Sequence, residues 1–382
     1  MSRIAVLGGG PAGGAAALAL ARGGAEVDLW LPARPGEKPC GGAVPEHVLP
    51  CLEGFDPSLL PVMVSPEAVL ENAAGRNVSL PLQGIRIFRR VDLDRALVEA
   101  AVAAGARRVA AKAERLEWTP EGVRVSSSGG GSEERVYGWI VGADGARGLT
   151  RRRLGLTPRG DSVGLGASLH GVESERMVLS FPDLADAYLW IFPRPGGASV
   201  GIAYTPERLS DGAARAALAV FLDRWLPAVW RDLPGPRYRY PIPVWGSHTL
   251  EAVRRGLDRR VLLAGDAAAV ADPLTREGIR YGFLSGTWAA EQLLAGEPER
   301  YPERLDRELG GELGRAVRAR DQFYEDRVGQ WMVPLARRLP GIRQVLGDLL
   351  ACQQPYRGLW PRLAREAIRS APLSRLRERG RG

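Results

Sequence analysis

The chain has 382 residues, of which 45% are hydrophobic and 25% charged, as expected for a globular protein with one large or two interleaved domains. It contains no run of about 18 apolar residues, which excludes a conventional transmembrane helix. A strand pattern begins at once and leaves no room for a signal peptide, so we expect a cytoplasmic protein.

Cysteine and charge usage exclude further classes. Cys40, Cys51 and Cys352 form no C-x-x-C pair and the three histidines are scattered, so no metal site is predicted. The net charge of +8 comes almost entirely from arginine. The sequence contains no compact basic motif with interleaved aromatic residues of the kind that would indicate nucleic-acid binding. From Arg357 to Arg381, arginines alternate with apolar residues, which fits a solvated helix face or a peripheral contact with an anionic membrane.

The first thirty-one residues predict a βαβ unit, with strands at 3–7 and 27–31 and a helix at 15–22. Gly8, Gly10 and Gly13 occupy the three glycine places of G-x-G-x-x-G, directly after the first strand. The first glycine permits a tight turn, the second admits a pyrophosphate to the backbone, and the third allows close helix–strand packing. We therefore predict a bound dinucleotide at the amino end of this helix.

One place in this unit departs from the pattern. The fingerprint expects Asp or Glu at the end of the second strand, where it binds the adenosine ribose. Leu31 stands there, and Glu26 and Asp28 come too early. The ribose contact is then expected from Arg34 or from the backbone.

Residues 32–50 are dense in proline and glycine, which predicts a loop without helix or central strand. A long irregular stretch directly after a nucleotide-binding unit is more often functional than connecting. Within it, Cys40 precedes Gly41 and Gly42. Either the thiol is a small packed side chain, or it lies against a cofactor with glycines chosen for close backbone approach.

The next stretch alternates in the manner of strands, and a helix follows. We expect strands at 78–80 and 85–88, a helix at 89–105, and three antiparallel strands at 107–118, 122–127 and 135–141. The Ser/Gly-rich residues 126–132 read as a hairpin tip rather than a linker. A buried strand at 138–142 ends in a small-residue turn that carries Asp144.

Residues 160–205 predict a second, antiparallel sheet, followed by a helix at 206–230 and an extended segment at 234–243. The strands are expected at 165–170, 177–181, 188–192 and 198–203. Tyr188, Trp190 and Phe192 fall on one face of their strand. That stripe is either sheet core or the lining of an apolar pocket.

Another buried strand, at 260–264, leads into Asp266, and a helix follows at 278–295. An acid at the carboxyl end of a strand is placed to bind a sugar or pyrophosphate, and the helix offers a second amino terminus. Beyond residue 298 only helices are expected.

Together these stretches resemble the FAD-dependent geranylgeranyl reductase family, within the class that shares the para-hydroxybenzoate hydroxylase fold. The glycine turn, the 142–147 turn and the 265–268 turn with Pro273 and Gly278 are common to that class. Lys-Pro-Cys-Gly-Gly at 38–42 and Tyr-Leu-Trp-Ile-Phe-Pro at 188–193 are selective for the reductase branch.

The resemblance implies an α/β protein with a Rossmann-like FAD-binding domain, built from a parallel sheet and a three-stranded β-meander, at 1–60, 88–158 and 250–298. An antiparallel substrate domain is implied at 61–87 and 159–249, and a helical region at 299–382. The implied FAD contacts are Gly8, Gly10, Ala12, Gly13, Arg34, Cys40, Gly41, Gly42, Arg90, Ala113, Asp266, Gly278 and Ile279. Tyr188, Trp190 and Phe192 are implied to line a prenyl channel, and Arg276 replaces a glycine that many relatives carry beside the flavin.

The implied activity is reduction of isoprenoid double bonds by hydride from reduced flavin, with NADPH or ferredoxin as a transient electron donor. Cys40 is the candidate proton donor, or a residue that orients the flavin. An FAD-dependent monooxygenase or halogenase is the alternative on this fold. A lipid-binding protein that has lost tight FAD binding together with its ribose acid is a third interpretation.

Overall fold

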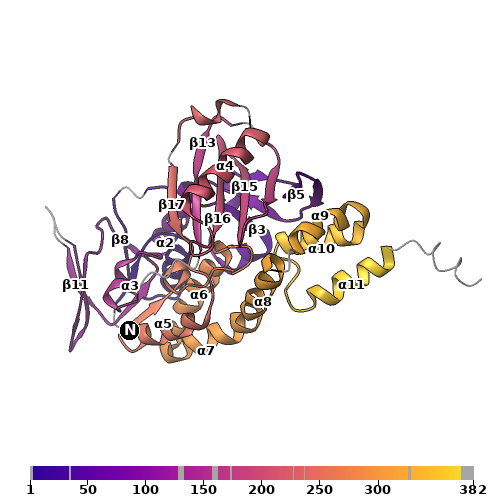
Figure 1. Ribbon diagram of the computed structural model, residues 1–382. Helices are drawn as coiled ribbons and strands as arrows, with labels where there is room; N and C mark the ends of the chain where they lie inside the picture. Colours follow the sequence, from indigo (N-terminus) through magenta and orange to yellow (C-terminus); the bar gives the residue numbers. More distant parts are fainter. Residues whose placement is uncertain are drawn as a thin grey trace, which may run out of the picture.

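The computed structural model describes residues 3–33, 36–127, 133–156, 162–172, 174–226, 228–235, 237–325 and 328–370. Within these ranges the chain forms four β-sheets and eleven α-helices (Figure 1). The helices are α1 (Pro11–Arg22), α2 (Arg90–Ala103), α3 (Leu149–Arg153), α4 (Asp211–Trp225), α5 (Ser247–Leu257), α6 (Ile279–Ala295), α7 (Tyr301–Leu305), α8 (Gly311–Glu325), α9 (Val328–Arg338), α10 (Pro340–Leu350) and α11 (Leu359–Ser370).

A five-stranded parallel sheet forms the nucleotide-binding part. Its order is β18 (Val261–Leu263), β12 (Trp139–Gly142), β1 (Ile4–Leu7), β2 (Val27–Trp30) and β8 (Arg107–Val109). Every pair in it is parallel, and α1 packs against both α2 and α6. The predicted βαβ unit is therefore confirmed, although α1 begins at Pro11 rather than at residue 15. Proline is favoured in the first helical turn, so Gly13 and Gly14 lie inside the helix.

The prediction of three antiparallel strands between 107 and 141 is wrong in part. The antiparallel sheet contains β9 (Arg115–Thr119), β10 (Gly122–Ser126) and β11 (Glu134–Tyr137), while β8 and β12 join the parallel sheet. Each of the two outer predicted strands is in fact two strands, because residues 107–109 pair with β2 and residues 139–142 pair with β1 in the parallel sheet. The hairpin tip itself, at 128–132, lies outside the described residues, and the flanking β10 and β11 are antiparallel.

The second large sheet has seven strands. Their order is β17 (Arg237–Pro241), β13 (Val163–His170), β16 (Gly197–Tyr204), β15 (Ala187–Arg194), β14 (Met177–Phe181), β5 (Glu67–Asn72) and β6 (Asn77–Pro81). The predicted antiparallel pairing is confirmed except between β14 and β5, which are parallel. One face packs on α4, where Leu218 and Phe221 share a core with Leu189 and Ile191. The predicted helix at 206–230 is shorter, because α4 begins after its N-cap Ser210.

A small sheet connects the two large ones. It contains β3 (Ala43–Pro45), β7 (Ile85–Ile87) and β4 (Met63–Val64). The expectation that 32–50 is wholly irregular is wrong at its end, because Ala43–Pro45 pairs with β7 and Glu46–Cys51 forms a 3-10 helix. The first part of the stretch, as far as it is described, is irregular.

The helices after residue 300 close one end of the molecule. Helices α9 and α10 contact the edge strand β6 of the seven-stranded sheet, α9 also contacts the neighbouring β5, and α11 packs on α10 (Figure 1). None of the helices in the described part of the chain is both long and apolar enough to cross a bilayer.

Candidate functional site

The parts singled out in the sequence meet around one cavity of about 860 Å³. Its walls are the turn after β1, the loop at 36–43, the turn after β18 with the start of α6, and one face of the seven-stranded sheet. The predicted residues that line it are Gly8, Gly10, Ala12, Cys40, Gly41, Gly42, Arg90, Tyr188, Trp190, Phe192, Asp266, Gly278 and Ile279. Segments up to 270 residues apart in the sequence thus form one site.

Three residues that were predicted to contact the cofactor are not among the described residues that line the cavity. Gly13 does not line the cavity but supports it, since a Cβ there would lie 1.8 Å from the carbonyl oxygen of Gly8. Ala113 packs against the core and is not among the cavity-lining residues. Arg34 lies outside the described residues.

The glycine turn is shaped for close approach of an anion. Gly8 has φ +105°, and a Cβ there would lie 2.4 Å from the carbonyl oxygen of Ala143. At Gly10, by contrast, the nearest atom to a Cβ is the Arg90 Nη2, at 3.6 Å. The start of α1 carries no side-chain cap. The first N–H groups of α1 and the Arg90 guanidinium are the donors that a pyrophosphate requires, and the open space at Gly10 gives it room to approach them.

Arg90 is a buried cation that α2 holds in place. Its Nε and Nη2 donate to the two carboxylate oxygens of Asp94 at 3.0 and 2.8 Å. Burial lowers the pKa of Arg90, but Asp94 and the adjacent Cys40 raise it to a value above that of free arginine. The side chain therefore stays charged beside the glycine turn, and it fits the FAD pyrophosphate.

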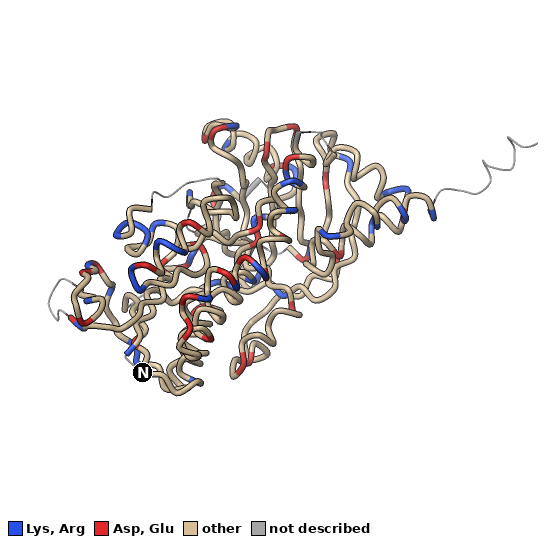
Figure 2. The backbone as a smooth tube through the Cα atoms, turned by 90° about the horizontal axis from the view of Figure 1, so that it is seen from below, with Lys and Arg blue, Asp and Glu red and all other residues tan. Residues whose placement is uncertain are grey.

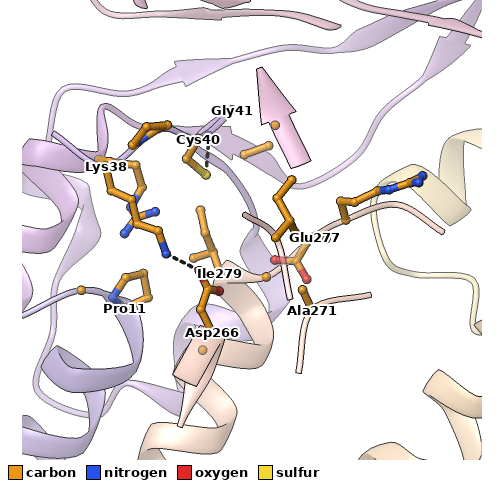
Figure 3. A pocket seen from close by; sticks show the side chains of 18 of the residues that line it. Pro11, Lys38, Cys40, Gly41, Asp266, Ala271, Glu277 and Ile279 are labelled. Carbon is orange, nitrogen blue, oxygen red and sulfur yellow. Dashed lines mark hydrogen bonds and ion pairs between the residues drawn. The ribbon is translucent and has the colours of Figure 1, made fainter. Parts of the chain in front are cut away.

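The turn after β18 carries an ion pair that the sequence alone did not indicate. Lys38 donates to Asp266 across the cavity, with 2.6 Å between Nζ and Oδ2 (Figure 3). Burial lowers the pKa of Lys38, whereas the Asp266 carboxylate raises it, and the net shift is upward. The lysine also lies over the Tyr240 ring, 5.3 Å from its centroid.

The Cys-Gly-Gly loop is held closely against its neighbours. The Gly42 N–H donates to Cys40 Sγ at 3.4 Å (Figure 3). Gly42 has φ +81°, and a Cβ there would lie 2.1 Å from the carbonyl oxygen of Phe88. A Cβ on Gly41 would lie 2.2 Å from the Phe192 ring. The backbone path therefore requires Gly42, the close approach of the Phe192 ring favours Gly41, and Cys40 lines the cavity.

The aromatic stripe lines the cavity and also belongs to the core: Trp190 is a core residue, and Tyr188 and Phe192 pack against that core. Tyr188 donates from its hydroxyl to the Thr275 carbonyl at 2.8 Å, and Trp190 donates to Ser199 Oγ at 3.2 Å. These bonds leave the ring surfaces for apolar contacts. Phe192 lies against Gly41 at the other end of the stripe.

The apolar wall of the cavity continues onto strands and helices whose sequences gave no distinctive signal. Residues from β5, β6 and β14 contribute Leu70, Leu80, Met177, Leu179 and Phe181. The carboxyl-terminal helices contribute Ala319, Phe323, Met332, Leu346, Leu349, Leu350, Leu359 and Trp360. Apolar residues at helical spacing are ordinary core residues, so their position at a cavity depends on tertiary packing.

The loop before α6 holds two buried charged groups. Arg276 has φ +55°, and its guanidinium forms an ion pair with Asp186 at 2.5 Å. Burial raises the pKa of the neighbouring Glu277, whose Oε1 accepts from the Arg280 N–H at 2.7 Å. These contacts fix the backbone that leads to Gly278 and Ile279.

Comparison with known proteins agrees with this geometry. Residues 67–211 match the model of an FAD-binding domain family. With the fold and the pyrophosphate-sized turn, this makes the protein an FAD-dependent oxidoreductase. The chain belongs to the geranylgeranyl reductase family. Over 315 residues it is 30% identical to the geranylgeranyl diphosphate reductase of Rhodobacter capsulatus, which covers 76% of this chain and 74% of that protein.

Solved structures confirm the fold. A geranylgeranyl bacteriochlorophyll reductase-like protein from Thermoplasma acidophilum superposes with a TM-score of 0.70 at 18% identity, over 96% of this chain and 99% of that one. The flavin-dependent brominase Bmp2 superposes with a TM-score of 0.64, also at 18% identity, over 91% and 92% of the two chains. The fold is therefore shared by enzymes of different chemistry, and the choice between them depends on the site.

Proposed function

We propose that this oxidoreductase reduces carbon–carbon double bonds in the isoprenoid chain of a lipid, quinone or pigment precursor. The observation that carries the proposal is the apolar extension of the cavity. It runs from the Cys-Gly-Gly loop along the inner face of β14 and β15 to α9, α10 and α11. A long hydrocarbon chain fits such a wall, which offers it few polar partners.

The chain's own residues prepare the site for this reaction. Bound FAD in its reduced form supplies a hydride, and the other alkene carbon needs a proton. Trp190, Phe192 and the leucines beside them exclude water from the reacting bond. We propose Cys40 as the proton donor, because its Sγ lies at the cavity wall and Arg90 lies next to it.

We propose that FAD is held by the residues that the cavity brings together. Gly8, Gly10, Ala12 and Arg90 would hold the pyrophosphate, and Gly13 would keep their turn in shape. Asp266, released from Lys38 or sharing it, would hold the ribityl chain. The backbone at Gly41, Gly42, Gly278 and Ile279 would lie along the ring. No role is assigned to Ala113, which does not line the cavity.

We expect the electron donor to bind to the protein only transiently. NADPH or ferredoxin is proposed, as in the sequence interpretation, because the described part of the chain contains a single nucleotide-binding sheet. Reoxidation of the reduced enzyme by substrate does not require either donor, which makes the donor a separate question from the reaction.

The test is anaerobic. Enzyme reduced with dithionite is mixed with geranylgeranyl diphosphate or with menaquinone, and the return of oxidised flavin absorbance is followed. Mass spectrometry should show two added hydrogens for each reduced bond. The Cys40→Ser variant should retain FAD and react more slowly. If no polyprenyl compound reoxidises the flavin, the proposal is wrong. Substrate-dependent oxygen uptake would instead support a monooxygenase or halogenase.

We also propose that α11 lies on an anionic membrane, from which a prenyl lipid enters. Its exposed face carries an apolar row, Trp360, Ala364 and Ile368, beside the exposed Arg365 and Arg369. Figure 2 shows several Lys or Arg positions, in blue, along the last described helix. Rows spaced by four residues share a helix face, and this pairing is typical of interfacial helices. Because Trp360 also lines the cavity, the membrane-facing side and the substrate wall meet at one residue.

A further inference from the structure

The missing acid at the end of β2 leaves the FAD ribose without its usual partner. Leu31 is 4% exposed and fills that place with apolar contacts. A Cβ on Gly9 would lie 3.2 Å from Leu31 Cδ1 and 3.1 Å from Val98 Cγ2. The leucine, the glycine turn and α2 therefore form a closed apolar contact. No ribose hydroxyl can find an acceptor in that side chain.

Asp28, which precedes this position on β2, is already fully used. It is 2% exposed, and its two oxygens accept from Arg107 at 2.7 and 2.6 Å. The Tyr137 hydroxyl donates to the same carboxylate at 2.7 Å. Asp28 therefore bridges the parallel sheet and the β-meander and does not face the cavity.

Two of the acids that line the cavity come from α2, the helix whose Val98 meets Leu31 beside Gly9. They are Asp94 and Glu99. Asp94 uses both oxygens on Arg90, and its Oδ2 would lie 3.9 Å from a Cβ on Gly10, at the pyrophosphate turn. Glu99 lies five residues further along α2; its side chain is 70% exposed and pairs with Arg95 at 4.0 Å between Nε and Oε1. At that distance the pair is weak, and the carboxylate is available.

The surroundings of Glu99 match the adenosine end of a dinucleotide. Pro32, Ala33 and Arg108 line the cavity on the same side, just beyond the end of β2. Arg108 donates to the Ala33 carbonyl at 3.1 Å, which ties the end of β8 to the segment after β2. In this fold the ribose lies next to the end of the second strand. A carboxylate on α2 can then face the ribose from the opposite wall.

We propose that Glu99 of α2 accepts hydrogen bonds from the ribose hydroxyls of FAD and replaces the acid that Leu31 has displaced. The two oxygens of one carboxylate suit the two neighbouring hydroxyls. Leu31 and Val98 hold α2 against the turn and so set the position of Glu99. The inference depends on FAD as the cofactor and not on the proposed substrate, so it stands or falls separately from the reductase function.

Apoprotein affinity provides the first test. FAD is removed from the holoenzyme, and the apoprotein is titrated with FAD while flavin fluorescence is followed. Glu99→Gln should raise the FAD Kd about threefold, the effect of weakening a charge-assisted hydrogen bond from a carboxylate that is 70% exposed in the free protein. Glu251→Gln is the matched control, because Glu251 forms an exposed ion pair with Arg255 on α5, away from the cavity. Equal FAD affinity in the two variants would overturn the proposal.

A second measurement separates ribose recognition from any general loss of folding. ADP and 2′,3′-dideoxy-ADP compete with FAD for the apoprotein, and their ratio of Kd values is determined within each variant. The wild type and the Glu251→Gln control should prefer ADP, and Glu99→Gln should lose most of that preference. Asp94→Asn should weaken both ligands while retaining the preference. If Asp94→Asn loses the preference and Glu99→Gln retains it, Glu99 is not the ribose ligand.

Discussion

Replacement of Gly42 by alanine tests whether the Cys-Gly-Gly loop has the conformation that the site requires. The left-handed backbone at φ +81° costs a non-glycine residue about 1–2 kcal/mol. The added Cβ would also lie 2.1 Å from the Phe88 carbonyl oxygen, which belongs to the backbone and cannot rotate away. Moving that backbone disturbs the junction of β3 and β7. We therefore expect a total loss of about 3 kcal/mol in the free energy of unfolding.

The same loop contains the matched control. Gly36 has no heavy atom within 4 Å of a Cβ and no positive φ, so Gly36→Ala should be neutral or stabilising by a few tenths of a kcal/mol. Urea unfolding of both holoenzymes, followed by tryptophan fluorescence, gives the difference. Flavin content after gel filtration should fall in Gly42→Ala only, since its N–H bond to Cys40 depends on the loop path. If both variants unfold at the same urea concentration, the left-handed conformation assigned to Gly42 in this loop is wrong.

Three further predictions concern a buried acid, a buried ion pair and the membrane face. Burial raises the pKa of Asp28, but bonds from its arginine and tyrosine partners lower it below 3.8. Asp28→Asn should thus lose about 2 kcal/mol at pH 7, measured by urea unfolding. The deficit should shrink as the pH falls below 3.8, where the carboxylate of the unfolded wild type is protonated, and vanish below the lower pKa of the folded protein. Arg276→Gly relieves a positive φ worth about 1–2 kcal/mol but leaves the buried Asp186 without this positive partner, with the Thr205 hydroxyl still donating to it, at about 3–5 kcal/mol. Its melting temperature should fall, and the added change Asp186→Asn should restore part of it. Ile368→Glu should weaken sedimentation with phosphatidylserine-containing vesicles, whereas Val220→Glu on α4, at similar exposure, should not; no vesicle binding by the wild type would refute the membrane proposal.

Much of the nucleotide-binding part could be predicted because its signals are local. A strand, a glycine turn and a helix follow one another within 22 residues, and each is specified by its own composition. The stripe of Tyr188, Trp190 and Phe192 was likewise visible as alternation along one strand. Whether it formed core or cavity depended on what packs opposite, and Gly41, nearly 150 residues earlier, supplies that contact.

The parts that sequence reasoning missed all involve distant partners. Lys38 and Asp266 are 228 residues apart, and neither position alone indicates an ion pair. The run at 107–118 alternates throughout, but Arg107 bonds to Asp28 on β2 and so draws its first half into the parallel sheet. Pairing partners, and not periodicity, decide where such a strand ends.

At Arg276 the backbone keeps the left-handed conformation typical of glycine, although the residue is not glycine. Many relatives carry glycine at this place by resemblance, and the backbone of Arg276 retains φ +55°, the left-handed geometry that glycine adopts freely. The guanidinium is anchored in this conformation: it donates to Ser162 at 3.1 Å, to Tyr324 at 2.9 Å and to Asp186. Several charge-assisted bonds outweigh a strain of about 1–2 kcal/mol. Asp186 itself has φ +50° and lies in the turn directly before β15, so its ion pair with Arg276 connects the start of a strand of the seven-stranded sheet to the loop before α6.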